Sequence, residues 1–311
     1  MINCIEEGTL AERLKPRIAV EQHFARSGRT NRHGRLERVM ERRIAMPLLR
    51  LGLQAAGVYS RGVRNALAPV VRVLPLRFPN LPPAFEGFQV LHLSDFHIDC
   101  SPDLAEALAN TLRQLRPDLC LMTGDYRYED YGPCDQVYPL MRRVISSISA
   151  RHGILGVLGN HDHSEIAFGL EELGVRMLVN QAVPVTRRDE SIWICGLDDP
   201  FDYQCHDLPG TLDQTPAGSF RILLAHCPEL YREAAKSGVA LYLTGHTHAG
   251  QIRFPGLGAL RHNAKCPRSF AYGHWLYKHM HGYTSAGLGC SSLPIRYNCP
   301  PEAVLIELRR G

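Results

Sequence analysis

Acidic, amide and imidazole side chains directly follow short apolar runs of this 311-residue sequence. Five runs end this way: 88–93 before Asp95 and His97, 119–122 before Asp125, 154–158 before Asn160 and His161, 220–225 before His226, and 240–243 before His246 and His248. Functional sites of open α/β sheets lie outside the carboxyl ends of the strands. One such run would mean little, but five are hard to explain by packing, so we expect them to converge on one site.

These residue types are ligands for divalent metal ions. Asp95 and His97 share one face of an extended backbone, as do His246 and His248, so each pair can reach the same ion. The Asp125 carboxylate has two oxygens and can bridge two ions. Manganese, iron and zinc all accept such ligands, and we expect two divalent ions, with manganese ranked first. Glycines at 124, 159 and 245 are expected to allow sharp turns at the strand ends.

The order of these motifs resembles that of the calcineurin-like metallophosphoesterase superfamily, over roughly residues 88–310. The sequence is most similar to the bacterial branch whose last motif reads Gly-His-Thr-His-x-Gly-Gln-Ile, here residues 245–252. Some members of that branch resemble, or are, enzymes of lipid A synthesis that split UDP-2,3-diacylglucosamine. The resemblance therefore implies hydrolysis of a phosphodiester or pyrophosphate bond by metal-bound hydroxide.

The resemblance also implies a role for each residue. One ion would be held by Asp95, His97 and His248, the second by Asn160, His226 and His246, with Asp125 bridging and His161 as the catalytic histidine. Many relatives carry an aspartate three residues after the bridging one, where it orients the catalytic histidine. Tyr128 stands there in this chain, which leaves open whether Glu129, Asp130 or another group orients His161. Ala249 replaces a common glycine and is expected to be harmless.

The alternation of apolar runs with amphipathic segments predicts an α/β fold, a layered β-sandwich flanked by helices. Helices are expected near 101–115, 135–149, 164–173 and 228–236. Pro79, Pro82 and Pro83 mark a boundary, so we expect a metallophosphoesterase domain at 81–311 and a basic, partly amphipathic helical extension at 1–80.

The extension is strongly basic. Residues 1–77 have a net charge of +9 and the remainder −5. The segment 45–77 mixes leucines and valines with five arginines, a pattern typical of a segment that lies on an anionic bilayer. Packing against the body, solvation and nucleic-acid binding remain alternatives, the last less favoured. Ten cysteines without a C-x-x-C pair favour a reducing compartment, so we expect a cytoplasmic protein. Binding of the segment 45–77 to a bilayer would place the protein peripherally on the inner face of the membrane.

Three functions stay open at this point. The first is a membrane-associated hydrolase of a lipid nucleotide such as UDP-2,3-diacylglucosamine, and the second a soluble phosphodiesterase acting on nucleotides or nucleic acid. The third is a non-catalytic binding scaffold, which the intact ligand set disfavours. The segment 261–277 is a candidate cap over a phosphorylated substrate, with Arg261, Lys265, Arg268 and Trp275 among its residues; a solvated surface loop is the alternative.

Overall fold

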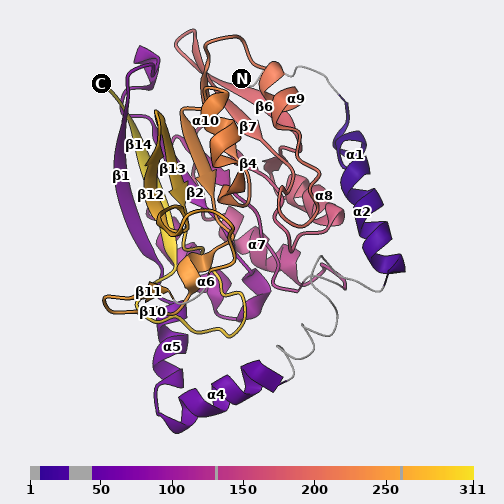
Figure 1. Ribbon diagram of the computed structural model, residues 1–311, viewed down its shortest axis with the longest axis vertical. Helices are drawn as coiled ribbons and strands as arrows, with labels where there is room; N and C mark the ends of the chain where they lie inside the picture. Colours follow the sequence, from indigo (N-terminus) through magenta and orange to yellow (C-terminus); the bar gives the residue numbers. More distant parts are fainter. Residues whose placement is uncertain (1–7, 28–43, 130–131, 260–261) are drawn as a thin grey trace.

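Two six-stranded sheets form the centre of this computed structural model, which describes residues 8–27, 44–129, 132–259 and 262–311 (Figure 1). The first sheet has the order β1-β14-β2-β3-β4-β5: Val70–Phe78, Glu302–Arg310, Gln89–Leu93, Leu119–Met122, Ile154–Gly156 and Val175–Met177. The second has the order β12-β13-β9-β8-β7-β6: Gly273–Tyr277, Met280–Thr284, Leu241–Thr244, Phe220–Leu224, Glu190–Gly196 and Gln181–Arg187. β10 (Arg253–Phe254) and β11 (Gly258–Ala259) form a small separate hairpin.

Parallel pairing brings the strand ends that carry the candidate ligands to one edge of each sheet. In the first sheet β2, β3, β4 and β5 run parallel to one another. In the second, β7, β8, β9 and β13 do the same. The antiparallel partners are β14 beside β2, β6 beside β7 and β12 beside β13. The predicted α/β sandwich is therefore present.

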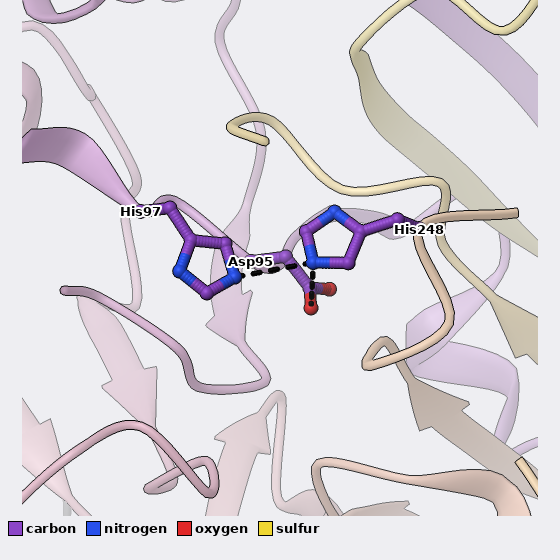
Figure 2. A group of neighbouring side chains, drawn as sticks. All are labelled: Asp95, His97 and His248. Atoms are coloured by element: carbon purple, nitrogen blue, oxygen red, sulfur yellow. Dashed lines mark hydrogen bonds and ion pairs between the residues drawn. The ribbon is translucent and has the colours of Figure 1, made fainter. Parts of the chain in front are cut away.

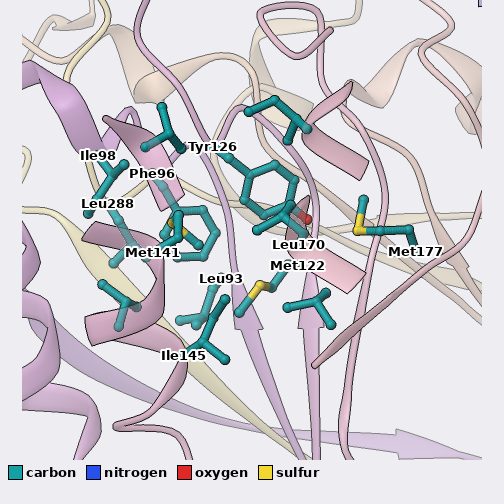
Figure 3. Packing of buried hydrophobic residues seen from close by; sticks show 14 of the residues in the cluster. Leu93, Phe96, Ile98, Met122, Tyr126, Met141, Ile145, Leu170, Met177 and Leu288 are labelled. Atoms are coloured by element: carbon teal, nitrogen blue, oxygen red, sulfur yellow. The ribbon is translucent and has the colours of Figure 1, made fainter. Parts of the chain in front are cut away.

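Alternating side chains of the strands fill three apolar layers. Leu119 and Leu121 point into the layer between the sheets, which also contains Ile222 and Leu243 of the second sheet. Cys120 and Met122 point the other way, into the layer under the helices of the first sheet, part of which Figure 3 shows. A third layer lies on the outer face of the second sheet. The two sheets are thus held together by a core that lies directly behind the candidate site.

Helices cover the outer faces of both sheets. They are α6 (Leu104–Leu112), α7 (Val137–Ile145) and α8 (Ser164–Glu172) on the first sheet, and α9 (Leu208–Asp213) and α10 (Tyr231–Lys236) on the second. Short 3₁₀ turns occur at Pro83–Phe85, Ile98–Cys100, Pro228–Leu230, His248–Gly250 and Arg268–Phe270. The helices expected near 101–115, 135–149, 164–173 and 228–236 correspond to α6, α7, α8 and the Pro228–Leu230 turn with α10.

The segment 1–80 differs from the expected helical extension. It contains α1 (Leu10–Arg13), α2 (Lys15–Arg26), α4 (Met46–Ala55) and α5 (Tyr59–Ala66), but its last part is β1. β1 pairs in parallel with β14 over nine residues, from Val70 with Glu302 to Phe78 with Arg310. The boundary expected at residue 80 therefore falls after a strand that belongs to the first sheet. Most of residues 1–44 not in α1 and α2 lie outside the described ranges.

Candidate metal centre

All eight candidate residues lie at the carboxyl ends of five parallel strands. Three of these strands are in the first sheet and two in the second. Asp95 and His97 follow β2, Asp125 follows β3, Asn160 and His161 follow β4, His226 follows β8, and His246 and His248 follow β9. His161 is half-buried, and the other seven are buried. The structure thus brings together the whole predicted set, from segments up to 153 positions apart in the sequence.

The backbone at these strand ends is unusual. Asp95, His97, Asp125, His246 and His248 all have positive φ, between 37° and 70°. Residues other than glycine rarely adopt this left-handed region, and where they do the strain is typically found at functional sites. No sequence pattern indicates it.

One group of ligand atoms surrounds His97 and His248, as Figure 2 shows. The Nε2 atoms of the two rings lie 3.1 Å apart, and His248 Nε2 lies 3.4 Å from Asp95 Oδ1. His97 Nε2 is also 3.4 Å from Asp125 Oδ2. Four groups from β2, β3 and β9 therefore present nitrogen and oxygen atoms to one small volume.

A second group of side chains also meets Asp125. His226 Nε2 is 3.2 Å from Asp125 Oδ2, the same oxygen that faces His97. His246 Nδ1 is 2.9 Å from Asn160 Oδ1. One oxygen of Asp125 thus faces a histidine of each group.

The hydrogen bonds of the histidines fit metal binding. His97 and His226 each place Nδ1 against a backbone carbonyl, at 2.8 Å from Arg127 O and 2.7 Å from Thr123 O. His246 places Nε2 2.9 Å from Asn263 O. Because a carbonyl only accepts, Nδ1 of His97 and Nδ1 of His226 carry a proton, and Nε2 is the nitrogen of each of these two rings that is left to bind an ion. His226 Nε2 is fully buried, and although it lies 3.2 Å from Asp125 Oδ2, it makes no well-aligned hydrogen bond there.

The charges of the buried groups are strongly interdependent. Burial alone would lower the pKa of His226, yet the Asp125 carboxylate raises it to about 10. Burial opposes ionisation of Asp125 as well, but His226 and His161 hold its pKa well below the usual value. Burial raises the pKa of Asp95 and lowers that of His248. Asp125 is therefore ionised, and a bound cation would take over the charge balance that protonated histidine otherwise supplies.

His161 is oriented by a backbone group. Its Nδ1 lies 2.7 Å from Tyr128 O, and its amide donates to Asp125 Oδ1 at 2.9 Å. The Tyr128 hydroxyl points elsewhere and donates to Ser292 O at 2.9 Å. The group that contacts His161 Nδ1 is therefore the peptide carbonyl of residue 128. Of the other candidates, Asp130 lies outside the described residues.

Asp162 is a further important residue, which the sequence reasoning missed. Its buried carboxylate accepts the amides of Gly159, Asp125 and Tyr126 at 2.8–2.9 Å, and so ties the β3 loop to the β4 loop. Burial raises its pKa to about 6. Its position directly after Asn160-His161 was the available signal.

The glycines at 159 and 245 have a different role from the expected one. Gly124 does turn with a φ of +89°, but the other two have no positive φ. A Cβ on Gly159 would lie 2.2 Å from Asp125 Oδ1, and one on Gly245 would lie 2.1 Å from Asp95 Oδ2. They are required because ligand carboxylates approach the backbone closely.

Only part of the expected cap faces the metal centre. Asn263 reaches the site through its carbonyl, which contacts His246. Trp275, in contrast, is buried in the core of the second sheet, stacked on Phe270 and bonded to Thr284 Oγ1. Trp275 therefore cannot contribute to such a cap, because its strand β12 turns the ring inward. Arg261 lies outside the described residues.

Comparisons with known proteins identify the family of this chain. The model of the calcineurin-like phosphoesterases matches residues 88–250. The chain is 30% identical over 246 residues to an uncharacterized metallophosphoesterase of Bacillus subtilis strain 168, YkuE, covering 74% of this chain and 82% of the relative. It is 29% identical over 231 residues to the phosphodiesterase YaeI of Escherichia coli strain K12, covering 71% and 82%. The phosphopantetheinyl hydrolase PptH of Mycobacterium tuberculosis shares 11% identity at a TM-score of 0.41, covering 66% of this chain and 91% of that one.

Ligand-bearing strand ends of this kind are typical of metal-dependent phosphoester hydrolases. The chain belongs to the calcineurin-like phosphoesterase family, and it is such an enzyme.

Proposed function

We propose that the chain binds two divalent ions, manganese first among them, and cleaves a phosphodiester or pyrophosphate bond. The observation that supports two ions is the position of Asp125, whose Oδ2 faces His97 at 3.4 Å and His226 at 3.2 Å. A pair of bound ions would supply an activated water and would neutralise the phosphoryl oxygens. Asp95, His97 and His248 would hold one ion, and Asn160, His226 and His246 the other, with Asp125 shared.

His161 is the proton donor in this proposal. Its Nδ1 is committed to Tyr128 O, so only Nε2 can face a substrate. His161, His97 and Asp125 present their atoms within 4.8 Å of one another, which places the ring beside the ions. A protonated Nε2 there can donate to the leaving oxygen as its bond to phosphorus breaks.

Asp125→Ala tests the site. The variant should lose both the bound metal and metal-dependent hydrolysis, because both groups share this carboxylate. Asp103→Ala is a matched control, since Asp103 is exposed and makes no capping bond to α6. Bound manganese is measured by elemental analysis and turnover with bis-p-nitrophenyl phosphate. An Asp125→Ala protein with wild-type metal content and turnover would refute the shared carboxylate.

A substrate panel tests the bond that is cleaved. The Escherichia coli relative is named a phosphodiesterase, which supports a diester over a monoester. We expect the manganese-loaded protein to turn over bis-p-nitrophenyl phosphate faster than p-nitrophenyl phosphate. UDP-2,3-diacylglucosamine tests the lipid-nucleotide substrate in parallel. Diester turnover without cleavage of this lipid would reject it in favour of a soluble nucleotide or nucleic-acid phosphodiesterase.

We propose that the protein binds a lipid substrate at a membrane surface, on the inner, cytoplasmic face of the membrane. In α4 no residue is buried, and Leu48, Leu49 and Leu51 are 62%, 40% and 63% exposed. Residues 45–77 contain five arginines and no acid, which suits an anionic bilayer. The nine cysteines of the described ranges are all free, which supports the reducing compartment. Among those residues, no helix is both long and apolar enough to span a bilayer.

Vesicle sedimentation tests this surface. The full chain should sediment with phosphatidylglycerol-containing vesicles, and Leu48→Ser/Leu51→Ser should reduce the bound fraction several-fold. Phe168→Ser is a matched control, because Phe168 is 41% exposed on α8, in another part of the fold. Equal sedimentation of wild type and the double variant would reject α4 as the membrane contact.

A further inference from the structure

The N-terminal helices α1 and α2 pack on the body of the enzyme. Leu10 and Leu14 are buried in the same apolar layer as Leu91 and Met122 of the first sheet. Figure 1 shows α2 beside α8, and Glu21 of α2 contacts Ser164, the first residue of α8. This helical segment lies outside residues 88–250, which the family model matches.

Arg17 of α2 reaches the loop that carries Asn160 and His161. Its side chain is completely buried, and Nη2 donates to Gly159 O at 2.6 Å and to Asp162 O at 2.5 Å. Nη1 donates to the Asp198 carboxylate. The guanidinium also lies 3.7 Å from the centroid of the Tyr203 ring. The residues it holds, 159 and 162, immediately flank the ligand and the catalytic histidine.

Glu21, one turn further along α2, holds the same loop at its far end. Its carboxylate accepts from the amide of Ser164 at 2.6 Å and from its hydroxyl at 2.7 Å. It also lies 3.6 Å from Arg17 Nε. Two side chains of one helix thus fix the backbone before and after Asn160 and His161.

We propose that Arg17 is a positioning residue of the active site, which fixes Asn160 and His161 through the carbonyls of Gly159 and Asp162. The inference rests on the proposed two-ion function, because it assigns these two residues to metal binding and proton transfer. A planar guanidinium can hold two carbonyls and a carboxylate at once, whereas a lysine ammonium cannot reproduce that fork. Groups that orient metal ligands in this way change metal affinity or activity by about 10- to 100-fold when they are replaced.

Two full-length variants test the proposal. Arg17→Lys keeps the charge beside Asp198 but loses the fork. Arg17→Met/Asp198→Asn removes the loop contacts without leaving an unpaired buried charge. This double variant replaces Arg17→Lys in the measurements if the lysine variant does not fold. Arg26→Met is the matched control, because Arg26 is exposed at the end of the same helix.

Three measurements separate positioning from mere stability. Manganese titration of the folded Arg17 variants should show one ion bound about 10- to 100-fold more weakly, the other being unchanged. With bis-p-nitrophenyl phosphate, kcat should fall by a similar factor while KM changes little. Hydrogen exchange of metal-free protein should be faster at the amides of residues 159–163. Arg26→Met should match wild type in all three.

Wild-type metal affinity, kcat and exchange in either folded Arg17 variant would overturn the proposal. Its failure is distinct from failure of the proposed function. If wild type binds no divalent ion and hydrolyses no ester, the two-ion function fails. Unchanged exchange in the metal-free Arg17 variants contradicts the positioning role whether or not the wild type is active.

Discussion

His161 and its partner illustrate how a backbone atom can replace a side chain. The resemblance to the superfamily implied an aspartate side chain at position 128, and here the Tyr128 carbonyl accepts a hydrogen bond from His161 Nδ1 at 2.7 Å instead. A change of the tyrosine side chain leaves that carbonyl in place. The side chain at position 128 can therefore make a different contact, and the Tyr128 hydroxyl donates to Ser292 O.

His161→Ala should lower kcat by about 10²–10⁴-fold, the usual contribution of a general acid. Metal content should stay close to wild type, because the proposed ligands are other residues. Tyr128→Phe is the control: it removes only the hydroxyl bond to Ser292 and should keep kcat within several-fold. Steady-state kinetics and elemental analysis measure both quantities. A His161→Ala protein that has lost one ion would assign this histidine to metal binding instead.

Gly159→Ala should disrupt the metal centre by displacing Asp125. Its new Cβ would lie 2.2 Å from Asp125 Oδ1 and 2.5 Å from Asp125 N, and Asp162 fixes both backbone segments. We expect a loss of about 1–3 kcal/mol in the free energy of unfolding, as for overpacking elsewhere, together with weaker metal binding.

Gly52→Ala is the control for that change. Gly52 lies in α4 with nothing within 4 Å of the added atom, so alanine should leave metal binding unchanged and favour the helix slightly. Urea unfolding and manganese titration compare the two variants. Equal behaviour of both would show that the close approach at Gly159 is unimportant.

At the scale of elements, the sequence predicts those helices and strands whose formation depends on local patterns. The strands β2, β3, β4, β8 and β9 were expected from apolar runs, and so were the site residues that follow them. α6, α7 and α8 were expected from their amphipathic spacing. In these segments the local preference and the final environment agree, so the pattern alone is sufficient.

The elements that were missed depend on partners distant in sequence. β1 contains two arginines and Pro75 among its apolar residues, and it becomes a strand by pairing with β14, more than 200 residues away. β12 and β13 contain mixed polar residues, and they are strands because β13 pairs with β9. The packing of α2 depends on the hydrogen bonds of Arg17 with Asp198 and with two loop carbonyls. No local pattern contains that information.

Leu14→Ala should show that α1 and α2 contribute to the stability of the whole enzyme. Leu14 is completely buried in the layer under the first sheet, so its truncation should cost about 2–5 kcal/mol in the free energy of unfolding. Leu48→Ala is a matched control within the same N-terminal segment, since Leu48 is 62% exposed and should change stability by less than about 0.5 kcal/mol. Urea denaturation of full-length proteins measures both; equal midpoints would mean that α1 and α2 are not docked in solution.

At the scale of the whole molecule, the site belongs to neither sheet alone. The first sheet supplies Asp95, His97, Asp125, Asn160 and His161, and the second supplies His226, His246 and His248. The apolar layer between the sheets therefore sets the distance between the two halves of the metal centre. A polar side chain in that layer should report on how tightly the sheets remain packed.

His92 is such a side chain. It lies on β2, fully buried, with Nε2 2.9 Å from Thr123 Oγ1 and its ring 6.1 Å from that of Tyr283 on β13. Burial lowers its pKa from 6.5 to about 3, so the folded protein keeps the ring neutral. The unfolded chain binds a proton near pH 6.5 and the folded chain does not. Stability is therefore lost as the pH falls from about 6.5 towards 3.

When the pH is lowered from 7.5 to 5.0, protonation of His92 in the unfolded chain should lower the free energy of unfolding of wild type by about 2 kcal/mol, as follows from the two pKa values. His92→Leu cannot titrate, so its stability should decline less over the same interval, whatever its absolute stability at pH 7.5. Urea unfolding of both metal-free proteins at the two pH values gives the two differences. Parallel declines would mean that His92 is hydrated in solution and that the sheets separate enough at β2 and β13 to admit water. In that case the two halves of the metal centre would also not be held at a fixed distance by the core behind them.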